Sequence, residues 1–122
     1  MHNPLEQLSQ CLQKLAQTPQ DGRLWCRVGF LYLQIHEIEE ALNTFKAAQH
    51  IAPQLGDAYY GESIAQLKLG ESDLLLAAIR IAMRLSPGDQ RLFSAYAYLC
   101  QATSQGPEAV LAAYKDWALR FA

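Results

Sequence analysis

The sequence predicts an all-α protein of about three helical hairpins, with one further helix in front of them. Three observations predict this fold. Proline recurs at intervals of 34 residues, as Pro19, Pro53 and Pro87. In the three successive copies of this unit, the fourth position is always aromatic and the eighth is always small. Because proline lacks a backbone N–H and restricts the residue before it, each proline is expected to follow the end of a helix.

The chain is expected to form a single domain. Its 122 residues are enough for one hydrophobic core, and 51% hydrophobic with 18% charged residues is typical of a globular chain. The repeat divides it into a leading helix, two regular repeats and a degenerate third repeat, at residues 1–20, 22–55, 56–89 and 90–122.

Seven helices are expected, near residues 4–17, 21–35, 38–51, 55–69, 72–85, 89–103 and 107–121. The first is predicted to be amphipathic, because leucine recurs along it at helical spacing, as Leu5, Leu8, Leu12 and Leu15. Since Pro19 follows it at the terminal proline position of the repeat, this helix is in phase with the second helix of a hairpin. Pro107 stands at the beginning of the last helix, where proline is tolerated.

Aromatic and small residues alternate in a way that suits packed hairpins. The fourth position of the repeat holds Trp25, Tyr59 and Phe93. The eighth holds Gly29, Ser63 and Ala97. The small residues are expected to let two helices approach closely, and the aromatic rings to fill the space between neighbouring hairpins.

These residues also carry a family resemblance. The pattern Trp25-x-x-Val28-Gly29-x-x-Tyr32, followed by Ala41-x-x-x-Phe45 and Pro53, resembles the signature of the tetratricopeptide repeat (TPR), with valine where leucine is usual. The second repeat keeps Tyr59, Gly70, Ala82 and Pro87. The resemblance implies a right-handed superhelix whose inner groove, lined by the first helix of each hairpin, binds extended peptides or partner helices.

The register of the family places groove positions on residues of each first helix: Arg23, Cys26, Arg27, Phe30, Leu33, Gln34, Asp57, Tyr60, Gly61, Ile64, Leu67, Lys68, Arg91, Ser94, Ala95, Tyr98, Gln101 and Ala102. The residues expected to bind a peptide are Arg23, Arg27, Phe30, Gln34, Tyr60, Ile64, Lys68, Arg91 and Tyr98. An apolar floor edged by arginine suits an amphipathic peptide with some acidic character, because the guanidinium fork can hold a carboxylate. The alternative interpretation is that each is ordinary surface or packs on a neighbour.

The sequence leaves two other functions open. The ending Tyr114-x-x-Trp117-x-x-Arg120-Phe121-Ala122 resembles the junction between the TPR array and the catalytic half in bacterial relatives of O-linked N-acetylglucosamine transferase. That resemblance implies the substrate-recruiting region of a peptide O-glycosyltransferase. A TPR-type bacterial secretion chaperone would use the same fold.

The last predicted helix carries an apolar stripe that favours association. Val110 begins it, and it continues through Tyr114, Trp117 and Phe121 at helical spacing. Terminal repeats normally need a polar outer face. We therefore expect self-association through one terminal helix, with these three aromatic residues as the candidates at the end of the chain. The alternative interpretation is that this stripe packs on the previous hairpin.

Signals for chemistry are missing from the sequence. Glycines form no phosphate-binding loop, and His2, His36 and His50 lack metal-ligand spacing. The three cysteines match no disulfide or zinc pattern and are expected to be buried thiols. A net charge of −2, no long apolar run and no basic leader are also apparent. We expect a cytoplasmic, non-enzymatic protein that binds protein, with no cofactor, metal, nucleic acid or membrane.

Overall fold

The computed structural model describes residues 3–102, which form six helices and contain no strand. The helices are α1 (Pro4–Gln17), α2 (Gly22–Gln34), α3 (Ile38–Ile51), α4 (Gly56–Leu69), α5 (Ser72–Leu85) and α6 (Gln90–Ala102). The predicted all-α class is confirmed, and the first six expected helices are found within one residue of their bounds. The predicted helix 107–121, with Tyr114, Trp117 and Phe121, lies outside the described residues.

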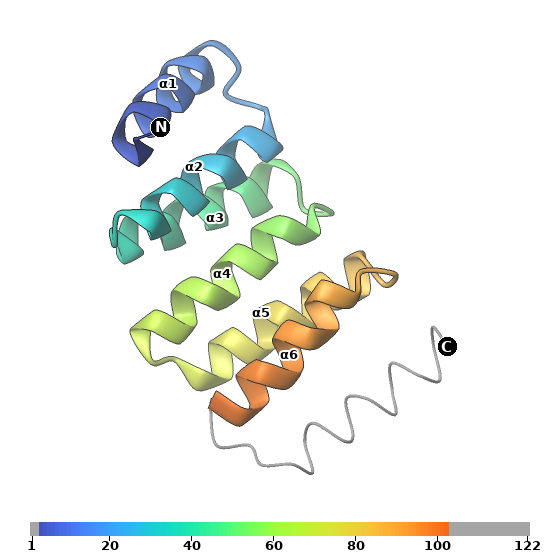
Figure 1. Ribbon diagram of the computed structural model, residues 1–122. Helices are drawn as coiled ribbons and strands as arrows, with labels where there is room; N and C mark the ends of the chain where they lie inside the picture. Colours follow the sequence, from blue (N-terminus) through green and yellow to red (C-terminus); the bar gives the residue numbers. More distant parts are fainter. Residues whose placement is uncertain (1–2, 103–122) are drawn as a thin grey trace.

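The helices stack in chain order. Each packs against the next, and α2 also packs against α4. Figure 1 shows α2, α4 and α6 in the nearer layer, with α3 and α5 behind them. The chain therefore places the first helix of each repeat in one layer, which is the arrangement that the 34-residue period predicts.

The turns between repeats have the same backbone geometry. Thr18, Ala52 and Ser86, each 34 residues from the next, end their helices at φ/ψ of −131/68, −133/77 and −131/67°. In each turn the N–H of that residue donates to the carbonyl oxygen four residues earlier, at 2.9, 2.8 and 2.9 Å. The helix α1 thus ends as α3 and α5 do, which confirms that it is in phase with the second helix of a hairpin.

The helix beginnings explain the small differences from the predicted bounds. Asp21 has an extended backbone, and its Oδ1 accepts a hydrogen bond from the N–H of Leu24 at 3.2 Å. It is therefore the N-cap of α2 and not its first residue. Leu55 has the same role by its backbone conformation before α4, without a side-chain cap.

Two of the repeated aromatic residues tie each turn to the helix that follows it. The indole Nε1 of Trp25 donates to the carbonyl oxygen of Pro19 at 2.8 Å. The hydroxyl of Tyr59 donates to the carbonyl oxygen of Pro53 at 3.1 Å. The aromatic residue at the fourth position therefore does more than fill space, because it satisfies the carbonyl of the proline six residues earlier. The ring of Phe93 has no donor for such a bond.

The turns inside the two hairpins both need a left-handed residue. His36 has φ of 63° and Gly70, at the same position of the next repeat, has φ of 78°. In both turns the N–H of the following residue returns to the carbonyl oxygen five residues earlier, at 3.0 and 2.9 Å. This bond closes the end of the first helix of the hairpin. The first hairpin forms it with a histidine that has a Cβ.

Replacing His36 with glycine is expected to raise the free energy of unfolding by about 0.5–1 kcal/mol. A left-handed conformation costs a residue with a Cβ about 1–2 kcal/mol, and removing that cost outweighs the greater freedom of glycine in the unfolded chain. Urea unfolding followed by circular dichroism measures the difference. Gly70→Ala is the matched reciprocal change and should destabilise by about 1 kcal/mol. A His36→Gly protein less stable than wild type would contradict this interpretation of the turn.

The buried residues form separate clusters along the stack. One joins α1 to α2 and includes Leu8, Leu15 and Val28. A second joins α2, α3 and α4 around Phe45, which is fully buried. A third joins α4, α5 and α6 around Ile79. Each cluster is made by neighbouring helices in the chain.

Helix α1 buries only part of the face that its leucines predict. Leu8 and Leu15 are buried against α2, whereas Leu5 and Leu12 remain 59% and 41% exposed. Three of the four α1 positions that match the buried positions of α3 and α5 are polar, namely Gln7, Gln10 and Lys14, whereas the fourth holds the buried Cys11. The side that α3 and α5 present to their own hairpin partners is therefore mostly hydrophilic in α1.

Candidate functional site

The predicted groove residues lie on the layer formed by α2, α4 and α6, which we call the first-helix face. Their exposure divides them into two groups. Phe30, Tyr60 and Ile64 are half-buried, whereas the others are exposed: Arg23, Arg27, Gln34, Lys68, Arg91 and Tyr98. Tyr98 is 64% exposed, which is large for an aromatic side chain. The face thus has an apolar middle and charged margins.

The apolar middle is anchored in the core. The ring of Phe30 meets the ring of the buried Phe45 edge to face, with centroids 4.9 Å apart, and lies 6.3 Å from the ring of Tyr60. Ile64 packs against the same buried cluster. These side chains are therefore held by packing from below, so any surface that they present is already ordered before a ligand arrives.

Some residues that the family register assigned to the groove are part of the core. Cys26 is 5% exposed and Leu33 is 8% exposed. Gly61 is buried beneath the ring of Phe45, which also lies over Gly29. Their register positions suit the inner face, but the large ring between α2 and α4 covers the glycines. Close approach of two helices was expected at Gly29, whereas no sequence pattern indicated that the ring of Phe45 in α3 would also cover Gly61 in α4.

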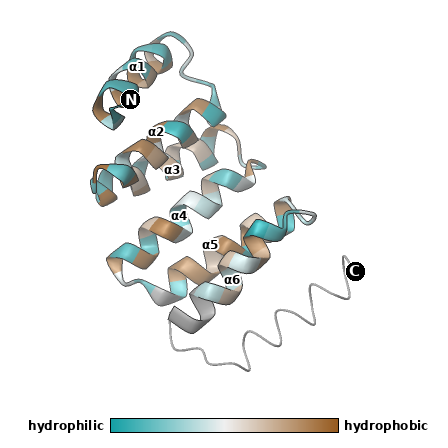
Figure 2. Ribbon diagram, in the orientation of Figure 1, coloured by the Kyte–Doolittle hydropathy of each residue, from teal (hydrophilic) through white to brown (hydrophobic). Residues whose placement is uncertain are grey.

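The charged margin is partly neutralised at one end. The guanidinium of Arg91 binds Asp89 through two contacts, Nε to Oδ1 at 3.1 Å and Nη2 to Oδ2 at 2.8 Å. Its Nη2 also lies 3.7 Å from Oδ1 of Asp57. The side-chain hydrogen bonds from Arg91 lower the pKa of Asp89 below its usual value. Figure 2 shows hydrophilic residues at the beginnings of α4 and α6, where Asp57 and Arg91 lie.

Arg23 and Arg27 differ from Arg91. Both are exposed, and within residues 3–102 neither forms an ion pair. Lys68, at the other end of α4, also has no ion pair with a described residue. The positive charge that remains available on the first-helix face is therefore concentrated on α2 and at the end of α4.

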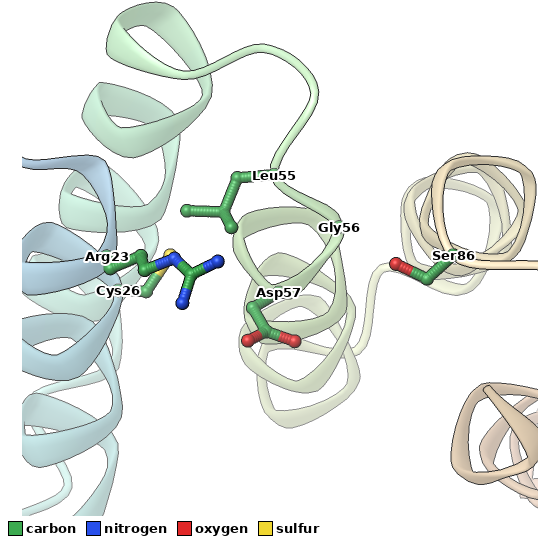
Figure 3. Close-up of a pocket in the computed structure, with 6 residues that line it drawn as sticks. All are labelled: Arg23, Cys26, Leu55, Gly56, Asp57 and Ser86. Atoms are coloured by element: carbon green, nitrogen blue, oxygen red, sulfur yellow. The ribbon is translucent and has the colours of Figure 1, made fainter.

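A pocket of about 300 Å³ opens at the beginnings of α2 and α4. It is lined by Arg23, Cys26, Leu55, Gly56, Asp57 and Ser86. In Figure 3, Arg23 extends from α2 toward the beginning of α4, Asp57 projects from α4, and the hydroxyl of Ser86 points toward α4. Sequence reasoning named Arg23 but found no pocket, because its walls come from two repeats and the turns that precede α4 and α6.

The thiol of Cys26 forms part of this pocket and stays protonated. Burial, together with the nearby negative charge of Asp57, raises its pKa from 9.0 to about 12. The predicted burial of the cysteines is confirmed for Cys11 and Cys26. Because a thiolate is the reactive species, Cys26 is a neutral wall of the pocket and not a nucleophile at neutral pH.

Alkylation should show this difference directly. At pH 8, iodoacetamide is expected to label Cys26 far more slowly in the folded protein than in urea, as followed by peptide mass spectrometry. The folded-state pKa exceeds the unfolded one, so the associated stability is present below pH 9 and is lost as pH rises toward 12. Cys26→Ala should weaken the loss of stability between pH 7.5 and 10.5. Equal labelling rates in the folded and unfolded protein would contradict the assignment.

The described residues give no support to a metal site or a membrane segment. Between residues 3 and 102, no three His, Cys, Asp or Glu side chains are grouped so that they could hold a metal ion. No helix in that range is long and apolar enough to cross a membrane. In this range the first-helix face combines an ordered apolar middle with separate charges.

Comparison with known proteins identifies the fold. No family model matches the chain, and no curated protein matches its sequence. Solved structures do match. MamA superposes with a TM-score of 0.80 at 18% identity, over 93% of this chain and 62% of that chain. A thermophilic TPR protein of Thermus thermophilus matches with a TM-score of 0.78 at 22% identity, over 90% of this chain and 61% of that one.

A third match is to an enzyme. The O-GlcNAc transferase of Thermobaculum terrenum has a TM-score of 0.84 at 19% identity, over 98% of this chain but only 23% of the enzyme. The chain thus spans less than two thirds of each of these three proteins. At these identities the likeness concerns the fold, which is the TPR superhelix that the sequence predicted.

Proposed function

We propose that this TPR fold serves as a protein-interaction module, which holds a peptide or a partner helix against the first-helix face. One observation carries the proposal. The face combines a preordered apolar middle, the exposed ring of Tyr98, and basic side chains that no described residue neutralises, Arg23, Arg27 and Lys68. Aromatic anchors with arginine nearby are typical of binding surfaces between proteins.

Affinity capture from the native lysate tests this proposal. Wild type is compared with a Tyr60→Ala, Tyr98→Ala variant, whose folding is checked by circular dichroism. The control is Leu74→Ala, which removes an exposed apolar side chain from α5, outside the first-helix face. We expect the double variant to lose partners that the control retains. Retention of every partner by the double variant would contradict the proposal.

A second function has one specific observation in its favour. The TPR-bearing O-GlcNAc transferase structure matches 98% of this chain, and the C-terminal residues resemble the junction of such enzymes. The chain would then be the substrate-recruiting region of a peptide O-glycosyltransferase, with catalysis located elsewhere. The test is the reading frame beyond Ala122 in the source genome. A continuation that encodes an α/β nucleotide-sugar domain would support this function, and a stop codon would exclude it.

A further inference from the structure

The pocket at the beginnings of α2 and α4 carries opposite charges on its two sides. Arg23 comes from α2 and Asp57 from α4. They occupy the same position, the second residue of successive first helices, because they are 34 residues apart. A chain that runs from one first helix to the next along the first-helix face therefore meets a cation and then an anion.

Both charges are available to a ligand. Arg23 has no ion pair among residues 3–102, and its guanidinium does not pair with Asp57, since the salt bridges in that range are those of Arg91. The nearest cation to Asp57 is Arg91 at 3.7 Å, but the same Nη2 lies only 2.8 Å from Asp89. Arg91 is therefore committed mainly to Asp89, which leaves Asp57 only partly compensated.

The rest of the pocket is fixed and uncharged. Leu55 and the protonated thiol of Cys26 form its apolar part. Gly56 leaves no room for a side chain, since a Cβ there would lie 2.7 Å from the Oγ of Ser86. Recognition in this pocket must therefore come from the two charged residues, with the hydroxyl of Ser86 as an additional polar group.

The distance between α2 and α4 determines how far apart the two recognised side chains of a peptide must be. Packed helices have axes about 8–10 Å apart. An extended peptide in the polyproline II conformation advances about 3.1 Å per residue and has three residues per turn, so that distance corresponds to about three residues, whose first and fourth side chains point to the same side. Side chains three positions apart could thus contact Arg23 and Asp57 at the same time.

We propose that Arg23 and Asp57 select an extended segment that bears one acidic and one basic residue three positions apart. The acidic side chain binds the guanidinium of Arg23, and the basic side chain binds the carboxylate of Asp57. This inference rests on the proposed peptide-binding function and adds to it a charge order. It also differs from a uniformly acidic ligand, because Asp57 repels a second carboxylate.

Synthetic peptides test the charge order. The probes are fluorescein-labelled nonapeptides of one Leu/Tyr/Ser background, with positions 3 and 6 occupied by Glu and Lys, Lys and Glu, Glu and Glu, or Gln and Gln. Fluorescence anisotropy measures their dissociation constants. We expect one of the two mixed-charge orders to bind best, by about tenfold over the Gln peptide, which corresponds to about 1.4 kcal/mol.

Charge reversal distinguishes recognition from a structural role. Arg23→Glu combined with Asp57→Lys should reverse the preferred order, so that the other mixed-charge peptide binds best. The control combines Glu39→Lys with Lys46→Glu, which are exposed on α3, and should leave the order unchanged. If Arg23 and Asp57 only stabilise the fold, the melting temperature will change and the order preference will not, which overturns the inference.

The failures of the two proposals are distinguishable. Peptide binding that does not depend on the charges at positions 3 and 6 overturns the charge order and leaves the peptide-binding function standing. Absence of binding by all four peptides, in a protein that is folded by circular dichroism, counts against both.

Discussion

Phe45→Ala is expected to lower the free energy of unfolding by about 3–5 kcal/mol, as removal of a buried phenylalanine ring does in well-packed cores. The ring is fully buried, lies over Gly29 and Gly61, and meets Phe30 edge to face at 4.9 Å. Its loss leaves a cavity between α2, α3 and α4 that the two glycines cannot fill. Urea unfolding followed by circular dichroism measures the loss.

The matched control is Leu74→Ala, because this leucine is 51% exposed on α5. A change within about 0.5 kcal/mol is expected there. The Phe45→Ala protein should also bind ligands of the first-helix face less well, since Phe30 and Ile64 rest on the same cluster. A stability loss below about 1 kcal/mol would show that the ring is not the central packing element.

Gly61→Ala is expected to destabilise the protein by about 1–3 kcal/mol, although helix propensity alone predicts a gain of about 1 kcal/mol. Gly61 lies inside α4, and a Cβ at this residue would overlap the ring of Phe45. Because that ring is enclosed on all sides by α2, α3 and α4, it cannot move aside freely. A loss of stability in Gly61→Ala would therefore show that α3 and α4 pack closely at this glycine, and a gain would show that they do not.

A double-mutant cycle with Phe45→Leu tests the cause. The smaller leucine leaves room for the added methyl group, so Gly61→Ala should cost less in that background, with a coupling of about 0.5–3 kcal/mol. Gly88→Ala is the control, because a Cβ there meets nothing within 4 Å. A stabilising effect of Gly61→Ala in the wild-type background would refute the packing described here.

The fold was predictable because its signals are local and repeated. An aromatic residue, a small residue and proline recur in the same order, and the helices predicted with them agree with the six described helices to within a residue. The turn geometry at Thr18, Ala52 and Ser86 then follows from the same period. The left-handed conformation of His36 was not predicted from the sequence. Glycine is the residue that usually takes this conformation at the end of a helix, and histidine carries a Cβ that disfavours it.

The candidate site was less predictable, because its properties depend on contacts between helices. The family register placed Gly61 in the groove, whereas the ring of Phe45 covers it. Arg91 looked like Arg23 in the sequence, but Asp89 two residues earlier neutralises it. A repeat pattern gives the face on which a residue lies, whereas side-chain packing and pairing decide whether that residue remains available to a ligand.

The division of the core into successive clusters has a consequence for how the chain opens. Each helix depends on its immediate neighbours, so disruption at one end need not spread at once to the other. Amide hydrogen exchange should therefore be graded, with α1 exchanging before the segments that surround Phe45. Such a chain can loosen at its margin, where α1 is attached through one small cluster, while the middle of the binding face keeps its shape.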